Sequence, residues 1–89
     1  ARWHAALDRI AALYRASRST ADRADSSAKV PGASSSDRET ALLGRELVAR
    51  VGTLYSNVLR SSSTPTADQR AQMGYFPTVL ADLRRRVLR

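Results

Sequence analysis

Large apolar residues recur every three or four positions in three separate stretches of this 89-residue chain. Such spacing places side chains on one face of an α-helix, because a helix completes a turn every 3.6 residues. The pattern therefore predicts three amphipathic helices that share one core. The three stripes are Trp3, Leu7, Ile10 and Tyr14; Leu43, Leu47, Val51, Leu54 and Val58; and Met73, Phe76, Leu80, Leu83 and Val87.

The predicted fold is all-α: an up-down-up three-helix bundle that forms a single domain over residues 1–89. We expect helices over about 2–18, 37–60 and 66–88. The segment 19–36 is predicted to be a long mobile loop, because it is rich in serine and has one sizeable apolar residue, Val30, directly before Pro31 and Gly32. A short second connection predicts that the second and third helices form a hairpin, with the first helix packed across it.

Two helix starts carry capping-box patterns. Ser36 precedes Glu39 by three residues, and Thr66 precedes Gln69 in the same way. In a capping box the two side chains each accept a hydrogen bond from a backbone N–H that the helix leaves free. The third helix contains Pro77, which has no N–H to donate, so we expect a kink or break there.

Two glycines, Gly44 and Gly52, fall inside the second predicted helix. Each costs up to ~1 kcal/mol of helix stability relative to alanine. Close approach of a neighbouring helix would account for them, and tolerated drift would account for them equally well. The sequence leaves both explanations open.

Composition sets the broad class. The chain is 43% hydrophobic and 26% charged, which is ordinary for a globular domain, and a core of this size stabilises a fold only marginally. The absence of cysteine excludes disulfides and thiolate metal sites, and no apolar run is long enough to span a bilayer. The first residue is Ala1 rather than Met, which indicates a processed product or an excised piece of a longer chain, and we expect a domain of a larger protein.

Residues that carry chemistry are sparse. The one histidine, His4, has no neighbouring nucleophile or ligand, and no serine elbow or glycine-rich phosphate loop is present. Among the eight acidic residues, Glu46 and Asp82 are spaced for helical ion pairs with Arg50 and Arg86. We therefore expect no enzymatic activity, no metal and no cofactor.

The most plausible function is that of a non-catalytic helical interaction or accessory domain. Its partner would be another protein or the rest of its own polypeptide, and self-association is compatible with the same surface. Aromatic residues that are not buried in the core would make the contact with this partner. The candidates are Trp3, Tyr14, Tyr55, Tyr75 and Phe76.

Two alternatives remain open. The net charge of +7 and the arginine-rich end, Arg84, Arg85, Arg86 and Arg89, would suit a basic module that binds nucleic acid. The proline-interrupted third helix would suit a small sensor domain with a ligand pocket near Pro77. Arginine is also strongly preferred over lysine, which suggests a GC-rich bacterial genome more than a chemical need.

From Val51 onward the chain resembles a known family. The segments Val51-Gly52-Thr53-Leu54-Tyr55, Pro65-Thr66-Ala67-Asp68-Gln69-Arg70 and Leu80-Ala81-Asp82-Leu83 resemble the C-terminal helical tail of bacterial β-propeller proteins of the Vps10, sortilin-like or sialidase-like type. The resemblance covers less than half of the chain, and the serine-rich segment and Gly74-Tyr75-Phe76-Pro77 depart from it. It implies an exported or periplasmic protein in which the tail has an interaction or stabilising role and no catalytic one.

Overall fold

Three α-helices make up the chain, as its apolar stripes predict. The computed structural model describes residues 2–61 and 64–88, with side chains from His4 onward. Within these residues α1 spans Arg2–Lys29, α2 spans Ser35–Arg60 and α3 spans Ala67–Val87, and no strand is present. The predicted all-α bundle is therefore confirmed.

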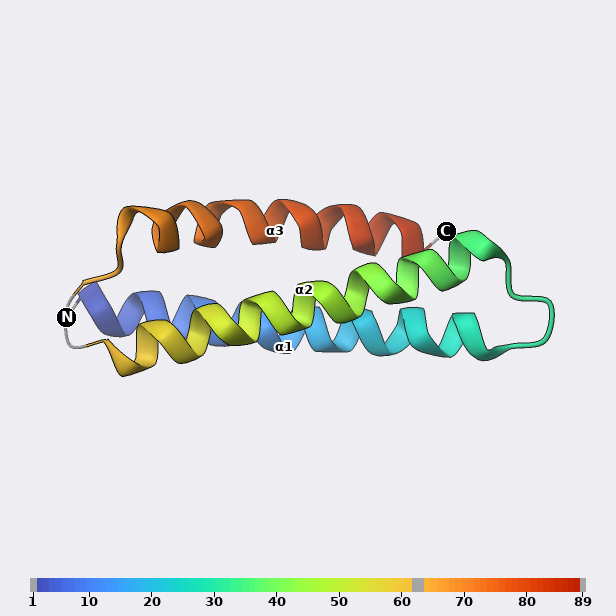
Figure 1. Cartoon of the computed structure of the whole chain (residues 1–89), viewed down its shortest axis with the longest axis horizontal. Helices are drawn as coiled ribbons and strands as arrows, with labels where there is room; N and C mark the ends of the chain where they lie inside the picture. The colour runs from blue at the N-terminus through green and yellow to red at the C-terminus, as the bar shows by residue number, and fades with distance from the viewer. Residues whose placement is uncertain (1, 62–63, 89) are drawn as a thin grey trace.

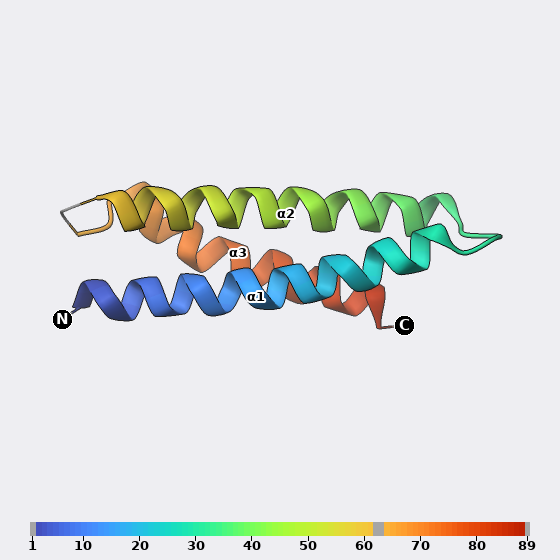
Figure 2. The same ribbon diagram turned by 90° about the horizontal axis from the view of Figure 1, so that it is seen from below.

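The helices lie side by side in an elongated rod of 49 × 18 × 17 Å (Figure 1). Successive helices run in opposite directions, so α1 and α3 point the same way. The most extensive contact is between α1 and α2, and α3 lies across this pair (Figure 2). The second and third helices, which we expected to form a hairpin, make a less extensive contact than α1 and α2 do. The reason is that α1 is longer than predicted and follows α2 along most of its length.

The core is built from the predicted stripes. Leu7 and Ile10 of α1, four residues of α2 and three of α3 form one buried cluster, which is completed by half-buried side chains at its edge. Burial of this apolar surface is the main stabilising contribution to a bundle of this kind. The buried residues of α2 and α3 are Leu47, Val51, Leu54, Val58, Phe76, Leu80 and Leu83.

The prediction of a long mobile loop over 19–36 is wrong. Helix α1 continues to Lys29, and only the short segment 30–34 connects it to α2. Small residues continue the core stripe of α1 in the same three-and-four spacing. Ser17, Ala21 and Ala24 are buried and Ala28 is half-buried. The serine-rich composition suggested a linker, but these small side chains allow another helix to come close.

That close approach occurs at Gly44 of α2. A Cβ atom added to Gly44 would lie 3.1 Å from both Cα and Cβ of Ala21, closer than ordinary van der Waals contact. Gly44 is therefore explained by contact with a neighbouring helix, one of the two explanations that the sequence leaves open. Beside this crossing, a guanidinium nitrogen of Arg45 lies 3.0 Å from a carboxylate oxygen of Asp25 and links α2 to α1.

The connection between α1 and α2 is a tight turn. Helix α1 ends directly before Val30 and Pro31, as expected for a residue followed by proline. Gly32 has a φ of 85°, a conformation that favours glycine, and the Ala33 N–H donates to the Val30 carbonyl over 3.1 Å. These features are those of a type II turn.

The start of α2 corrects a second prediction. The capping box consists of Ser34 and Asp37, not Ser36 and Glu39. The Asp37 N–H donates to Ser34 Oγ and the Ser34 N–H donates to a carboxylate oxygen of Asp37, both over 3.0 Å. Both pairs have the spacing that a capping box requires. With Ser34 as the N-cap, α2 begins directly after the turn, at Ser35.

The start of α3 confirms its prediction. The Thr66 hydroxyl accepts from the Gln69 N–H over 3.1 Å, and the Gln69 side-chain oxygen accepts from the Thr66 N–H over 2.9 Å. The helix then continues without interruption through Pro77. There is no break at this proline, and the expected kink stays a prediction.

Candidate interaction surfaces

The five aromatic residues expected to contact a partner lie in different environments. Phe76 is buried, with 4% of its surface exposed, while Tyr14 and Tyr55 are half-buried and pack against the core. Among the four of these residues whose side chains the structure describes, only Tyr75 is largely exposed, at 60%. Trp3 belongs to α1, and its side chain lies outside the described part of the structure.

Tyr75 stands beside an apolar cleft between α2 and α3, which we call the α2–α3 groove. Residues of α2 at helical spacing form one wall, residues of α3 form the other, and the volume is ≈ 120 Å³. The ring centroids of Tyr75 and Phe76 are 6.0 Å apart, so the exposed ring continues the buried one. The lining residues are Leu43, Glu46, Leu47, Arg50, Tyr75, Phe76 and Val79.

Two charged side chains, Glu46 and Arg50, line this groove together with its apolar residues. A guanidinium nitrogen of Arg50 lies 2.6 Å from a carboxylate oxygen of Glu46, which is the ion pair predicted from their spacing. A second, more open hollow of ≈ 570 Å³ adjoins the groove and shares Arg50, Tyr75 and Phe76 with it. Because they share these residues, the two hollows adjoin between α2 and α3, and we call them together the α2–α3 furrow.

Sequence reasoning missed the exposed leucine pair in the first half of α2, of which Leu43 lines the groove. Leu42 is 60% exposed and Leu43 is 37% exposed, although Leu43 fits the predicted core stripe. A signal was available, because adjacent helical residues point about 100° apart and cannot both face the same core. The leucine pair thus marked a place where an apolar side chain had to remain at the surface.

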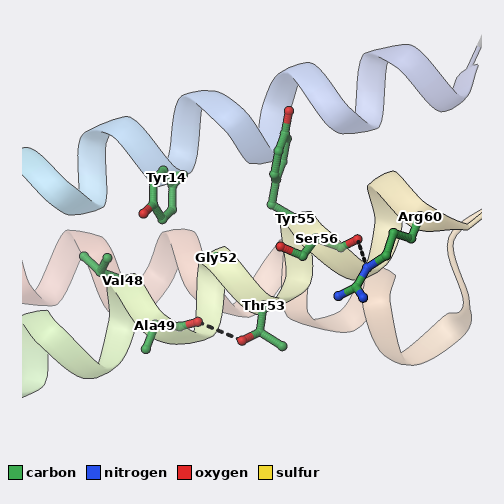
Figure 3. A pocket seen from close by; sticks show the side chains of 8 residues that line it. All are labelled: Tyr14, Val48, Ala49, Gly52, Thr53, Tyr55, Ser56 and Arg60. Atoms are coloured by element: carbon green, nitrogen blue, oxygen red, sulfur yellow. Dashed lines mark hydrogen bonds between the residues drawn. The ribbon is translucent and has the colours of Figure 1, made fainter.

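A third hollow of ≈ 570 Å³ lies between α1 and α2. Tyr14 and Tyr55 project into the space between the two helices, and the Tyr14 ring packs over Gly52 (Figure 3). Two of its polar side chains are engaged within α2, since Thr53 Oγ1 donates to the Ala49 carbonyl and Arg60 Nε donates to the Ser56 carbonyl, over 3.0 and 3.3 Å. The hollow therefore has an aromatic wall and two polar side chains that are bonded to the backbone of their own helix.

The arginines expected to form one basic cluster are divided. Arg85 and Arg86 both pair with Asp82, at 3.4 and 3.2 Å, so the predicted Asp82–Arg86 pair is confirmed and two of the cations are partly neutralised. Arg84 lies on another side of α3, beside α1. Arg89 lies outside the described residues.

Other classes of site find little support in the described residues. Across residues 2–61 and 64–88, no group of three histidine, cysteine or acidic side chains could hold a metal ion. His4 is exposed near the start of α1. The two hollows between α2 and α3 are lined by residues close to Pro77 in the sequence, but not by Pro77 itself. In the same part of the chain, no helix has the length and apolar character needed to cross a membrane.

Comparisons with known proteins assign no family. No protein-family model, no curated protein and no solved structure matches this chain. The functional argument therefore depends on the surfaces described above.

Proposed function

We propose that this chain is a non-catalytic helical interaction domain that binds a helical segment of a partner protein, or of the rest of its own polypeptide, in the α2–α3 groove. One observation carries the proposal. The groove presents Tyr75, 60% exposed, together with the partly exposed Leu43 above a floor of buried core residues. Tyrosine is enriched among the residues that contribute most to binding at protein interfaces.

The shape of the furrow suits a helix. On α2 its lining runs from Leu43 to Asn57, which corresponds to about 21 Å along the helix axis. An amphipathic helix of about four turns would lie along this length and become the fourth helix of the bundle, as in other helix-in-groove complexes. The Glu46–Arg50 pair beside the groove would remain at the polar rim of the interface.

A non-catalytic role is supported by the use of the acidic residues. Asp37 caps α2, Asp25 pairs with Arg45, and Glu46 and Asp82 pair with arginines. These four carboxylates are engaged in a helix cap or in ion pairs, and no two of them line the same described hollow as an acid–base pair. If the resemblance to a propeller tail is correct, the partner would be the preceding propeller and the protein would be exported or periplasmic.

Photo-crosslinking in the cells that make the full-length protein tests the proposal. A photoreactive phenylalanine analogue replaces Tyr75, and in a control protein the same analogue replaces Ala81, which is exposed on α3 roughly 120° around the helix. We expect position 75 to form a crosslink to a defined protein segment and position 81 to form little or none. Equal crosslinking from both positions, or none from position 75, would contradict the proposal.

A further inference from the structure

A small hollow lies on the opposite side of α3, between α3 and α1, and we call it the arginine hollow. Its volume is ≈ 200 Å³, and it is more enclosed than the furrow between α2 and α3. Arg23 of α1 and Arg84 of α3 line it together, although they are far apart in the sequence. The complete lining is Ala16, Ser19, Thr20, Arg23, Arg84, Val87 and Leu88.

The two arginines have no counter-ion among the described residues, unlike four other arginines on the surface. Arg45, Arg50, Arg85 and Arg86 each pair with a carboxylate, whereas the described residues provide no hydrogen bond or ion pair for the side chains of Arg23 and Arg84. Two unpaired guanidinium groups beside one hollow repel each other, and an anion bound between them would attract both and so offset this repulsion.

The uncharged lining also suits an anion. Thr20 Oγ1 donates its proton to the Ala16 carbonyl over 3.0 Å, so it is committed to its own helix. The hydroxyl of Ser19 has no such partner in the described structure and is available to donate. Val87 and Ala16 contribute apolar surface, which strengthens a nearby charge interaction by reducing the access of water.

We propose that the arginine hollow binds one small tetrahedral oxoanion, a phosphate or sulfate group. Guanidinium groups bind such anions through paired N–H donors, and arginines on two helices would hold the anion from both sides. Asp22 lines the adjoining hollow with Arg23, and α3 ends at this site with the negative end of its dipole. Both features oppose the anion, so we expect a dissociation constant of about 1–10 mM.

The spacing of the arginines that share a helix face with Arg23 and Arg84 favours a single group over a long polyanion. Arg9 precedes Arg23 by fourteen residues and Arg70 precedes Arg84 by the same number, which places each about 21 Å away along the bundle. Arg70 also donates to the Pro65 carbonyl over 2.7 Å. A phosphate group in the arginine hollow therefore reaches neither of these more distant cations.

A nuclear magnetic resonance titration with inorganic phosphate tests the proposal on the whole chain, at constant ionic strength maintained with chloride. We expect saturable shifts at the Nε–H signals of Arg23 and Arg84 and at amides of residues 19–23. Arg84→Gln and Arg23→Gln should each weaken binding about tenfold, a typical effect for a charge-assisted contact. The matched controls Arg85→Gln and Arg15→Gln remove the same charge elsewhere and should leave the affinity within about twofold.

The outcomes separate the proposal from its competitors. Asp22→Asn should tighten binding, because it removes an opposing charge that lines the adjoining hollow. Equal weakening by Arg84→Gln and Arg85→Gln would indicate general charge screening and overturn the proposal, as would the absence of saturation up to tens of millimolar phosphate. A parallel titration with a DNA duplex adds one more outcome. If the chain binds the duplex far more tightly than it binds phosphate, and Arg9→Gln and Arg84→Gln weaken duplex binding equally, the surface binds a polyanion and the small-anion proposal is wrong.

Discussion

Replacing Gly44 by valine should destabilise the bundle by about 3 kcal/mol, a large share of the stability of so small a domain. The reason is the contact with Ala21, where even a Cβ atom would lie 3.1 Å from the backbone Cα of α1. Because the obstacle is the backbone of a helix rather than the tip of a flexible side chain, α1 and α2 must move apart. Urea unfolding followed by circular dichroism measures the loss.

Alanine substitutions at three glycines provide the controls. A Cβ at Gly74 would meet nothing within 4 Å, so Gly74→Ala should stabilise the protein by about 0.5–1 kcal/mol through helix propensity. At Gly52 the Cβ would lie 3.3 Å from a ring atom of Tyr14, which can rotate, so Gly52→Ala should be close to neutral. Gly44→Ala should destabilise by about 1–2 kcal/mol. If Gly44→Ala stabilises as much as Gly74→Ala, the two helices do not meet at Ala21.

Truncating Phe76 to alanine should cost about 3–5 kcal/mol, because its ring is buried in the core between the helices. The adjacent Tyr75→Ala should change stability by no more than about 0.5 kcal/mol, since most of the Tyr75 ring faces solvent. Thermal and urea unfolding of the two variants, which remove aromatic rings from neighbouring positions, measure this difference directly. Similar losses in both variants would contradict the assignment of Phe76 to the core and Tyr75 to the surface.

The helical content of this chain was predictable wherever the core residues are large. Leu7 and Ile10 in α1, and the stripes of α2 and α3, follow helical spacing closely enough to place all three helices. The second half of α1 was not predicted, because Ser17, Ala21 and Ala24 carry little apolar surface and resemble the serine-rich turn that follows. Their role becomes visible only when Gly44 of the opposing helix is considered with them.

The N-cap residue of α2 and the surface groove could not be predicted from the local sequence, for different reasons. Ser34 and Ser36 each precede an acidic residue by three positions, so the choice between them depends on the turn at Gly32. The candidate site depended on packing to a greater extent. The apolar stripe placed Phe76 on the core face of α3 and left Tyr75 off it, as the structure shows, but the groove beside Tyr75 depends on how α3 packs against α2.

The most direct test of the proposed function is the affinity of the full-length protein for the partner segment that crosslinks to position 75. Tyr75→Ala should weaken this binding at least tenfold, or about 1.4 kcal/mol, while the melting temperature stays nearly unchanged. The control is Leu88→Ala, which removes an apolar side chain that is 63% exposed near the end of α3, away from the groove. This control should leave the affinity intact. Equal affinities of the Tyr75→Ala, Leu88→Ala and unmodified proteins would contradict a binding site in the α2–α3 groove.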